Sequence, residues 1–260
     1  MHEVFFILNK FPNKQEKISF ILNATCKIVS QSIVRSQTRD GFNIQKMQAL
    51  NYSDIGYKYY HDLSTFTKYI RNNFGIKNEL IRKLDDNHVF KNKIYTIKDE
   101  DIKKLFSFIK YSIGNCGEMA LLSSMFLNYF LYIFDKNNNT KFFLFFEKYK
   151  IHFGFLKNGD HAFIYFIEKK PYGKENIIVI DPFFNTTLSS EDYNKLLVKN
   201  IDHKFVKRNS IPTLSFEIRL KNSSMLTMHN YCLRFGIYEM LKKIAEEFKL
   251  RKQNNLSLHY

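Results

Sequence analysis

The chain has 260 residues and 45% of them are hydrophobic, which excludes wholesale disorder and allows a sizeable buried core. A formal net charge of +15 usually suggests nucleic acid or an anionic membrane as a partner, but the basic residues are spread along the chain without a dense block. We therefore expect no nucleic-acid partner, and a basic surface that favours an acidic protein substrate.

Residues 1–95 are expected to form mainly helices. These expected helices cover 14–30, 53–72 and 76–84. The first residues, MHEVFFILNK, lack a basic region before their short apolar run, so we expect no Sec signal peptide. A further helix is expected over 99–111, because three acidic residues would occupy its favourable first turn.

The longest apolar segment, 119–134, is interrupted by two serines and an asparagine and is short for a bilayer span. It predicts a central buried helix and no transmembrane segment. The break before this helix is expected at Ile113–Cys116, and DKNNNT at 135–140 is expected to end it.

Beyond residue 140, apolar runs alternate with turn residues, which predicts strands. The expected strands contain KFFLFFEKY, KIHFGFL, HAFIYFIE and NIIVID within 141–181, and TLSFEIRL at 213–220. Asn158-Gly159 is a hairpin signal, a short helix is expected over 190–198, and 225–252 has the periodicity of a closing helix. Helices, then an antiparallel sheet, then a helix indicate an α+β fold.

The chain has only four prolines and nine glycines and no linker rich in these residues, which favours one compact unit. We expect a single two-lobed domain over 1–260. Its expected parts are a mainly helical lobe at 1–95, a catalytic core at 96–220, and a C-terminal helix with a polar tail at 221–260.

The three cysteines, Cys26, Cys116 and Cys232, are widely spaced, and there is no CxxC motif or Cys/His cluster. This pattern predicts neither a disulfide framework nor a zinc site, and it favours a reducing, cytosol-like compartment. The sequence also lacks a Gly-rich phosphate loop, an HExxH motif and an EF-hand pattern. We therefore expect no cofactor and no metal.

Cys116 lies between two glycines in IGNCGEMALL, where a loop turns into the apolar helix. The positive end of the helix dipole favours a thiolate at this place. Gly114 and Gly117 allow a tight turn and close approach of a substrate, and backbone N–H groups of the first turn would face a developing oxyanion. Glu118 opposes activation, so Cys116 needs a second cation, which an imidazolium would supply.

His161 begins one expected strand, in NGDHAFIYF, and Asp181 ends the next, in IIVIDPFF. If these strands pair antiparallel about a turn near Pro171, 161 faces 181 and 163 faces 179. Directly opposite residues bring their Cβ atoms to about 4.5–5.5 Å, within reach of a carboxylate–imidazole hydrogen bond. The pairing predicts that Asp181 orients His161 and stabilises its charged form, while the other ring nitrogen reaches the thiol.

Each signal alone has a simpler interpretation. A cysteine among apolar residues is usually a small buried hydrophobe, and we accept that interpretation for Cys26 and Cys232. A histidine at a strand start is usually a surface or capping residue, and Asp-Pro after a strand is usually a turn. A cysteine at a helix start followed by a histidine and an aspartate at facing strand ends favours a catalytic triad. The other histidines, His152 included, have no such partner.

The blocks GNCGEMA, GDHAFIYF and VIDPFF, within 112–185, resemble the motifs of papain-like and transglutaminase-like cysteine enzymes. They look most like the compact Cys–His–Asp domains of bacterial toxins and secreted effectors. The resemblance implies Cys116 as nucleophile, His161 as general base and acid, and Asp181 as orienting carboxylate.

The chain departs from these families in two places. Phe183 follows Asp-Pro where a tryptophan is common, and no motif assigns a side-chain oxyanion donor. Asn115, with Gly114, is the nearest candidate for oxyanion binding or positioning. Other candidates by residue type alone are Gln31, Gln37, Gln45 and Gln48.

The resemblance implies acyl transfer on protein amides through a thioester, as in a glutamine deamidase or transglutaminase-type bacterial effector. A papain-like cysteine protease is the alternative, because all these enzymes share the triad. A host protein is the expected substrate, reached by secretion without a Sec signal. One non-enzymatic rival is a host-binding helical module, which predicts an inert buried Cys116 and no contact between His161 and Asp181. A degenerate member of the fold is the other rival, although all three residue types are intact.

Overall fold

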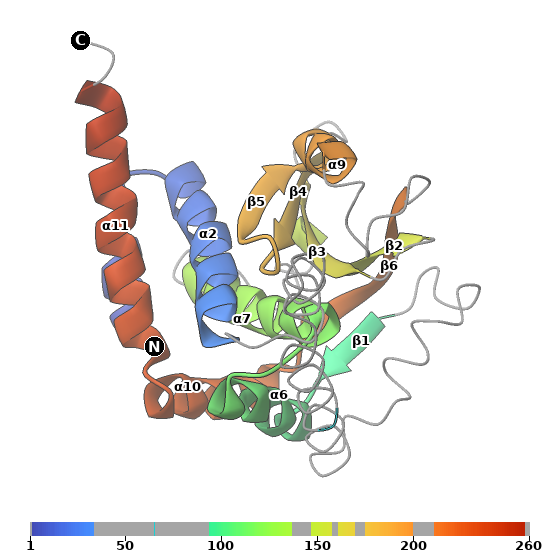
Figure 1. The fold of residues 1–260 in the computed structure, drawn as a ribbon. Helices are drawn as coiled ribbons and strands as arrows, with labels where there is room; N and C mark the ends of the chain where they lie inside the picture. The colour runs from blue at the N-terminus through green and yellow to red at the C-terminus, as the bar shows by residue number, and fades with distance from the viewer. Residues whose placement is uncertain are drawn as a thin grey trace, which may run out of the picture.

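The computed structural model describes residues 2–33, 65, 94–136, 147–157, 161–169, 175–199 and 211–257. In this part of the chain, helices combine with a single mixed sheet, so the expected α+β class is confirmed (Figure 1). The helices expected over 53–72 and 76–84 lie outside the described residues, apart from helical Thr65.

The sheet has six strands in the order β1-β6-β2-β3-β4-β5. Their bounds are β1 Ile94–Ile97, β2 Tyr149–Lys157, β3 Ala162–Lys169, β4 Glu175–Asp181, β5 Thr186–Ser189 and β6 Ile211–Leu220. Neighbours pair antiparallel except β1 and β6, which are parallel, so the expectation of a wholly antiparallel sheet is wrong at this edge. The long chain between β1 and β6 provides the crossover that a parallel pair requires.

The described helices are α1 His2–Leu8, α2 Lys14–Ser32, α6 Asp99–Tyr111, α7 Cys116–Lys136, α9 Ser190–Lys199, α10 Met225–Arg234 and α11 Ile237–Ser257, with a 3-10 turn at Asn222–Ser224. The helices expected over 14–30, 99–111 and 190–198 are confirmed. A single closing helix is wrong, because Gly236 adopts a left-handed φ of 65° and separates α10 from α11. Residues 147–148, expected in a strand, are helical.

α7 is the central helix of the main core and packs against α2, α6 and three strands of the sheet (Figure 1). Two of its buried polar residues make hydrogen bonds to backbone carbonyls. Ser124 Oγ donates to Leu121 O at 2.7 Å, and Asn128 Nδ2 donates to Ser124 O at 2.8 Å and to Ile218 O at 3.2 Å. Among the described helices, α7 is apolar and long enough to cross a membrane, but it is buried inside the protein as a core helix.

Alternate residues of β3 serve two separate cores. Ile164 and Phe166 point into the main core, which also contains residues of α1, α2 and α11. Phe163 and Tyr165 point into a smaller cluster that includes Tyr193 of α9. Helices therefore cover both faces of the sheet near β4. The expected division into two lobes stays a prediction.

Gly154→Ala should destabilise the fold by about 1–3 kcal/mol through overpacking. A Cβ at Gly154 would lie 2.7 Å from Phe163 Cε2 and 2.8 Å from Tyr165 Cε2, on rings that line the smaller cluster. Gly117→Ala is the matched control, because its Cβ meets nothing within 4 Å and alanine favours the helix. Urea unfolding measures both. Equal stability of the two variants would contradict this packing.

Candidate active site

His161 and Asp181 form a buried pair at neighbouring ends of β3 and β4. His161 Nε2 lies 2.6 Å from Asp181 Oδ2, and the two residues are 4% and 0% exposed. The strands pair Ile164 with Ile180, which places 181 across from 163, so the expected register is wrong by two residues. A shift of two keeps each side chain on its face, and the pair therefore still meets on the diagonal.

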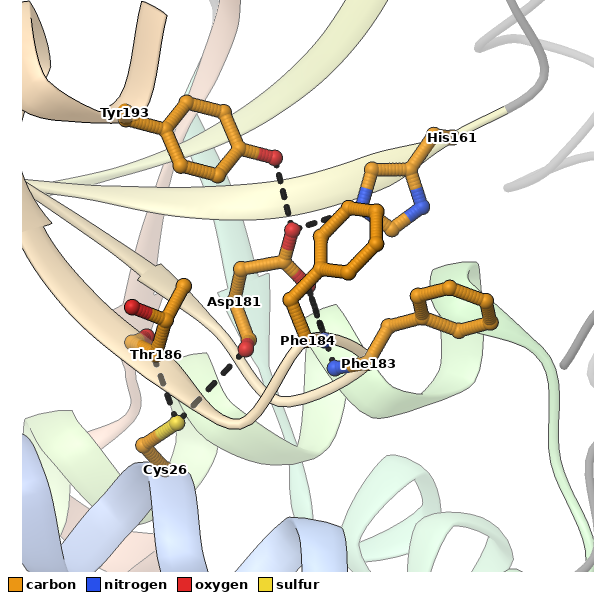
Figure 2. Close-up of polar contacts among 7 residues, drawn as sticks. All are labelled: Cys26, His161, Asp181, Phe183, Phe184, Thr186 and Tyr193. Carbon is orange, nitrogen blue, oxygen red and sulfur yellow. Dashed lines mark hydrogen bonds and ion pairs between the residues drawn. The ribbon is translucent and has the colours of Figure 1, made fainter. Parts of the chain in front are cut away.

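The Asp181 carboxylate is held by donors on both of its oxygens (Figure 2). Oδ1 accepts from the backbone N–H of Phe183 at 3.0 Å and of Phe184 at 3.4 Å. Oδ2 accepts from the hydroxyl of Tyr193 at 2.6 Å, in addition to its contact with His161. The Asp-Pro turn thus folds back on its own side chain, and this arrangement fixes the orientation of the carboxylate.

Tyr193 is a site residue that sequence reasoning missed. It lies in SEDYNKLLVK, where its spacing from Leu196 and Leu197 indicates an inward-facing stripe. That signal predicts burial but does not identify the partner of the hydroxyl.

Cys26 of α2 contacts the backbone beneath the same turn. Its thiol donates to Thr186 O at 3.3 Å and to Asp181 O at 3.6 Å (Figure 2). Burial, followed by the negative charge of Asp181, raises the pKa of Cys26 to about 12. The environment of Cys26 therefore fits its expected role as a small buried hydrophobe. Its contacts with Asp181 O and Thr186 O also connect α2 to the site.

The electrostatic environment keeps His161 protonated at neutral pH. Burial alone would lower its pKa, but the charge and hydrogen bond of Asp181, aided by the thiol of Cys116, raise the pKa to about 10. Because Nε2 is held by Asp181, Nδ1 is the nitrogen left to act elsewhere; it is buried and makes no hydrogen bond within the described residues. The rings of Phe183 and Phe184 pack against the imidazole in T-shaped geometry, at centroid distances of 5.1 and 5.3 Å.

Cys116 is the first residue of α7 and is 8% exposed. Glu118, fully buried, accepts the backbone N–H of Asn115 at 2.9 Å, as the acidic residue of a capping box does. Glu118 therefore fixes the turn that presents Cys116. A Cβ at Gly114 would lie 3.3 Å from the Glu118 Cβ, whereas Gly117 has open space on that side.

The structure places some of the predicted site residues together and others apart. His161 and Asp181 are in contact, Cys116 lies close enough to influence the imidazole, and Asn115 and Gly114 form the turn before Cys116. Among the glutamine candidates, Gln31 is exposed in α2, and Gln37, Gln45 and Gln48 lie outside the described residues.

No family model matches this chain, and neither a curated protein nor a solved structure matches it. The described part of the chain also contains no group of three or more His, Cys, Asp or Glu side chains that could hold a metal ion. The interpretation of the site therefore depends on its own geometry.

His161→Gln should remove a pH-dependent part of the stability. The pKa of His161 rises from 6.5 to about 10 on folding, so the stabilisation is fully present below pH 6.5 and is lost as the pH rises through 10. Over this interval, the free energy of unfolding of wild type minus that of the variant should fall by up to about 1.4 kcal/mol per pH unit. Chemical denaturation at a series of pH values measures it.

His152→Gln is the matched control on the adjacent strand. Burial lowers the pKa of His152, so its contribution is lost as the pH falls below 6.5 and is constant on the alkaline side. A flat difference between wild type and His161→Gln over the alkaline interval would contradict a charged His161.

Proposed function

We propose that this protein is a cysteine-dependent acyl-transfer enzyme of the papain-like and transglutaminase-like class, acting on glutamine side chains of proteins. The observation that carries the proposal is the buried His161–Asp181 pair, with 2.6 Å between Nε2 and Oδ2, on an imidazole that Cys116 also influences. A charged imidazole beside a thiol at a helix start supplies an activated nucleophile and a proton donor.

In the first half-reaction, the Cys116 thiolate attacks the carbonyl carbon of the amide, and the carbonyl oxygen becomes an oxyanion. Backbone N–H groups of the first turn of α7 would stabilise this charge. His161 donates the Nδ1 proton to the amide nitrogen, the C–N bond breaks, and ammonia leaves. The products are a thioester on Cys116 and a neutral His161.

In the second half-reaction, neutral His161 takes a proton from water, whose oxygen attacks the thioester carbon. The C–S bond breaks, giving a glutamic acid side chain, the Cys116 thiolate and a protonated His161. The new carboxyl group then releases its proton to solvent and becomes glutamate. A lysine amine in place of water gives a cross-link by the same steps. Asp181 holds Nε2 throughout and stabilises the charged ring.

The alternative of a papain-like protease uses the same steps with the amine of a peptide bond as leaving group.

The resemblance to secreted bacterial effectors favours a protein of a host cell as substrate, and the net charge of +15 favours an acidic one. Three buried, uncrosslinked cysteines suit a reducing compartment.

The host-binding module is the weaker hypothesis. It requires no contact between His161 and Asp181, yet the two side chains meet at 2.6 Å in a turn that orients the carboxylate. The contact therefore favours catalysis.

Cys116 should react with iodoacetamide selectively at about pH 6.5, where an ordinary thiol with a pKa of about 8.5 is almost fully protonated. We expect roughly 10- to 100-fold faster labelling of Cys116 than of Cys26 and Cys232, whose pKa values burial raises. Peptide mass spectrometry measures all three rates in one sample. In His161→Gln the advantage of Cys116 should be lost, and equal rates in wild type would contradict an activated thiol.

The protein should release ammonia from glutamine-containing acidic proteins, and Cys116→Ser should abolish the release by removing the nucleophile. Cys26→Ser is the matched control, because that cysteine contributes no reacting atom. A coupled ammonia assay with intact-mass analysis measures the reaction, in which hydrolysis adds about 1 Da per site. Fragmentation of the substrate without ammonia would instead identify a protease.

A further inference from the structure

The hydroxyl of Tyr193 and the imidazole of His161 share one carboxylate oxygen. Asp181 Oδ2 accepts from the Tyr193 hydroxyl at 2.6 Å and contacts His161 Nε2 at 2.6 Å (Figure 2). Tyr193 and Asp181 are each 0% exposed, so water does not compete for this oxygen. The Tyr193 hydroxyl and the imidazole are therefore linked through a single oxygen atom, Asp181 Oδ2.

The packing around Tyr193 fixes this hydroxyl in place. Its ring packs against Phe163 at a centroid distance of 4.9 Å, inside the smaller cluster. The helix that carries it begins at a capped turn, in which Asp192 N donates to Ser189 Oγ at 3.1 Å. Core packing alone would be satisfied by phenylalanine, so the hydroxyl needs a separate explanation.

We propose that Tyr193 is a positioning residue: by donating to the Asp181 oxygen that also contacts His161 Nε2, it sets how strongly the carboxylate stabilises the imidazolium. The proposal rests on the proposed function, because the hold of Asp181 on Nε2 affects how readily His161 gives up its Nδ1 proton, the one that leaves with ammonia. A donor on Oδ2 disperses part of the carboxylate charge and weakens its hold on the imidazolium. His161 then becomes a better acid.

Three titratable groups of other elements interact with this pair in the described residues: Cys26 of α2, Cys116 of α7 and Tyr193 of α9. Tyr165 of β3 acts on Tyr193 and not on the pair itself. The thiol of Cys26 donates to the backbone oxygen of Asp181 and not to its carboxylate. Tyr193 is therefore the described hydroxyl that acts directly on Oδ2.

The test is an NMR titration of the His161 imidazole nitrogens in the full-length protein, assigned with His161→Gln. In Tyr193→Phe the midpoint of the titration should rise by roughly half a pH unit or more, because the carboxylate loses a donor. A merely structural role predicts the opposite direction, since a loosened pair would let the midpoint fall toward the ordinary value of about 6.5. A lower or unchanged midpoint overturns the proposal.

Tyr165→Phe is the matched control. Tyr165 belongs to the same cluster, and its hydroxyl is not among the described donors to Asp181, so the midpoint should stay unchanged. If Tyr193→Phe fails to fold, 3-fluorotyrosine at 193 keeps the ring and the hydroxyl while making the hydroxyl a stronger donor. The midpoint should then fall, and an unchanged or higher midpoint overturns the proposal.

The titration does not depend on turnover, so the two hypotheses fail separately. One possible result is slow alkylation of wild-type Cys116 together with a His161 midpoint that rises in Tyr193→Phe. This result would overturn the proposed enzyme activity and support the coupling of Tyr193, Asp181 and His161. Fast alkylation of Cys116 together with a His161 midpoint that is unchanged in Tyr193→Phe would overturn the positioning role of Tyr193. The proposed enzyme activity would then still stand.

Discussion

The buried carboxylate of Asp181 is the constraint on which the site depends. A charge at 0% exposure is stable only if hydrogen bonds replace its lost hydration, and donors here come from the following turn, from α9 and from His161. Removal of any donor leaves part of a buried charge uncompensated. The ends of β3 and β4, the Asp-Pro turn and α9 are therefore held in one arrangement by a single side chain.

The position of α7 explains how the thiol of Cys116 comes to lie near the imidazole of His161. The helix is buried along its length, so packing on both sides fixes its first residue with little freedom. Glu118 completes the turn before it by accepting the Asn115 backbone N–H, and Cys116 lies at the boundary between core and surface. Rigid supports of this kind position a side chain more accurately than a loop would.

Patterns of local sequence predicted much of this arrangement. Apolar periodicity identified α2, α6, α7 and α9, and residue parity placed His161 and Asp181 on one face even though the register was wrong by two. Long-range features were not predictable: β1 is four residues long and gains its identity only by pairing with β6. The partner of Tyr193 was equally hidden, because a hydroxyl in a helix gives no sign of which distant oxygen it meets.

The thiol of Cys26 and the carbonyl of Asp181 that it contacts are 155 positions apart in the chain. During synthesis, α2 therefore emerges long before the turn that it supports, and Cys116, the proposed nucleophile, emerges before both His161 and Asp181. Closing such long loops is slow and cooperative, so partly made or partly unfolded chains contain the thiol without its activating partners. The proposed active site is therefore complete only in the folded chain.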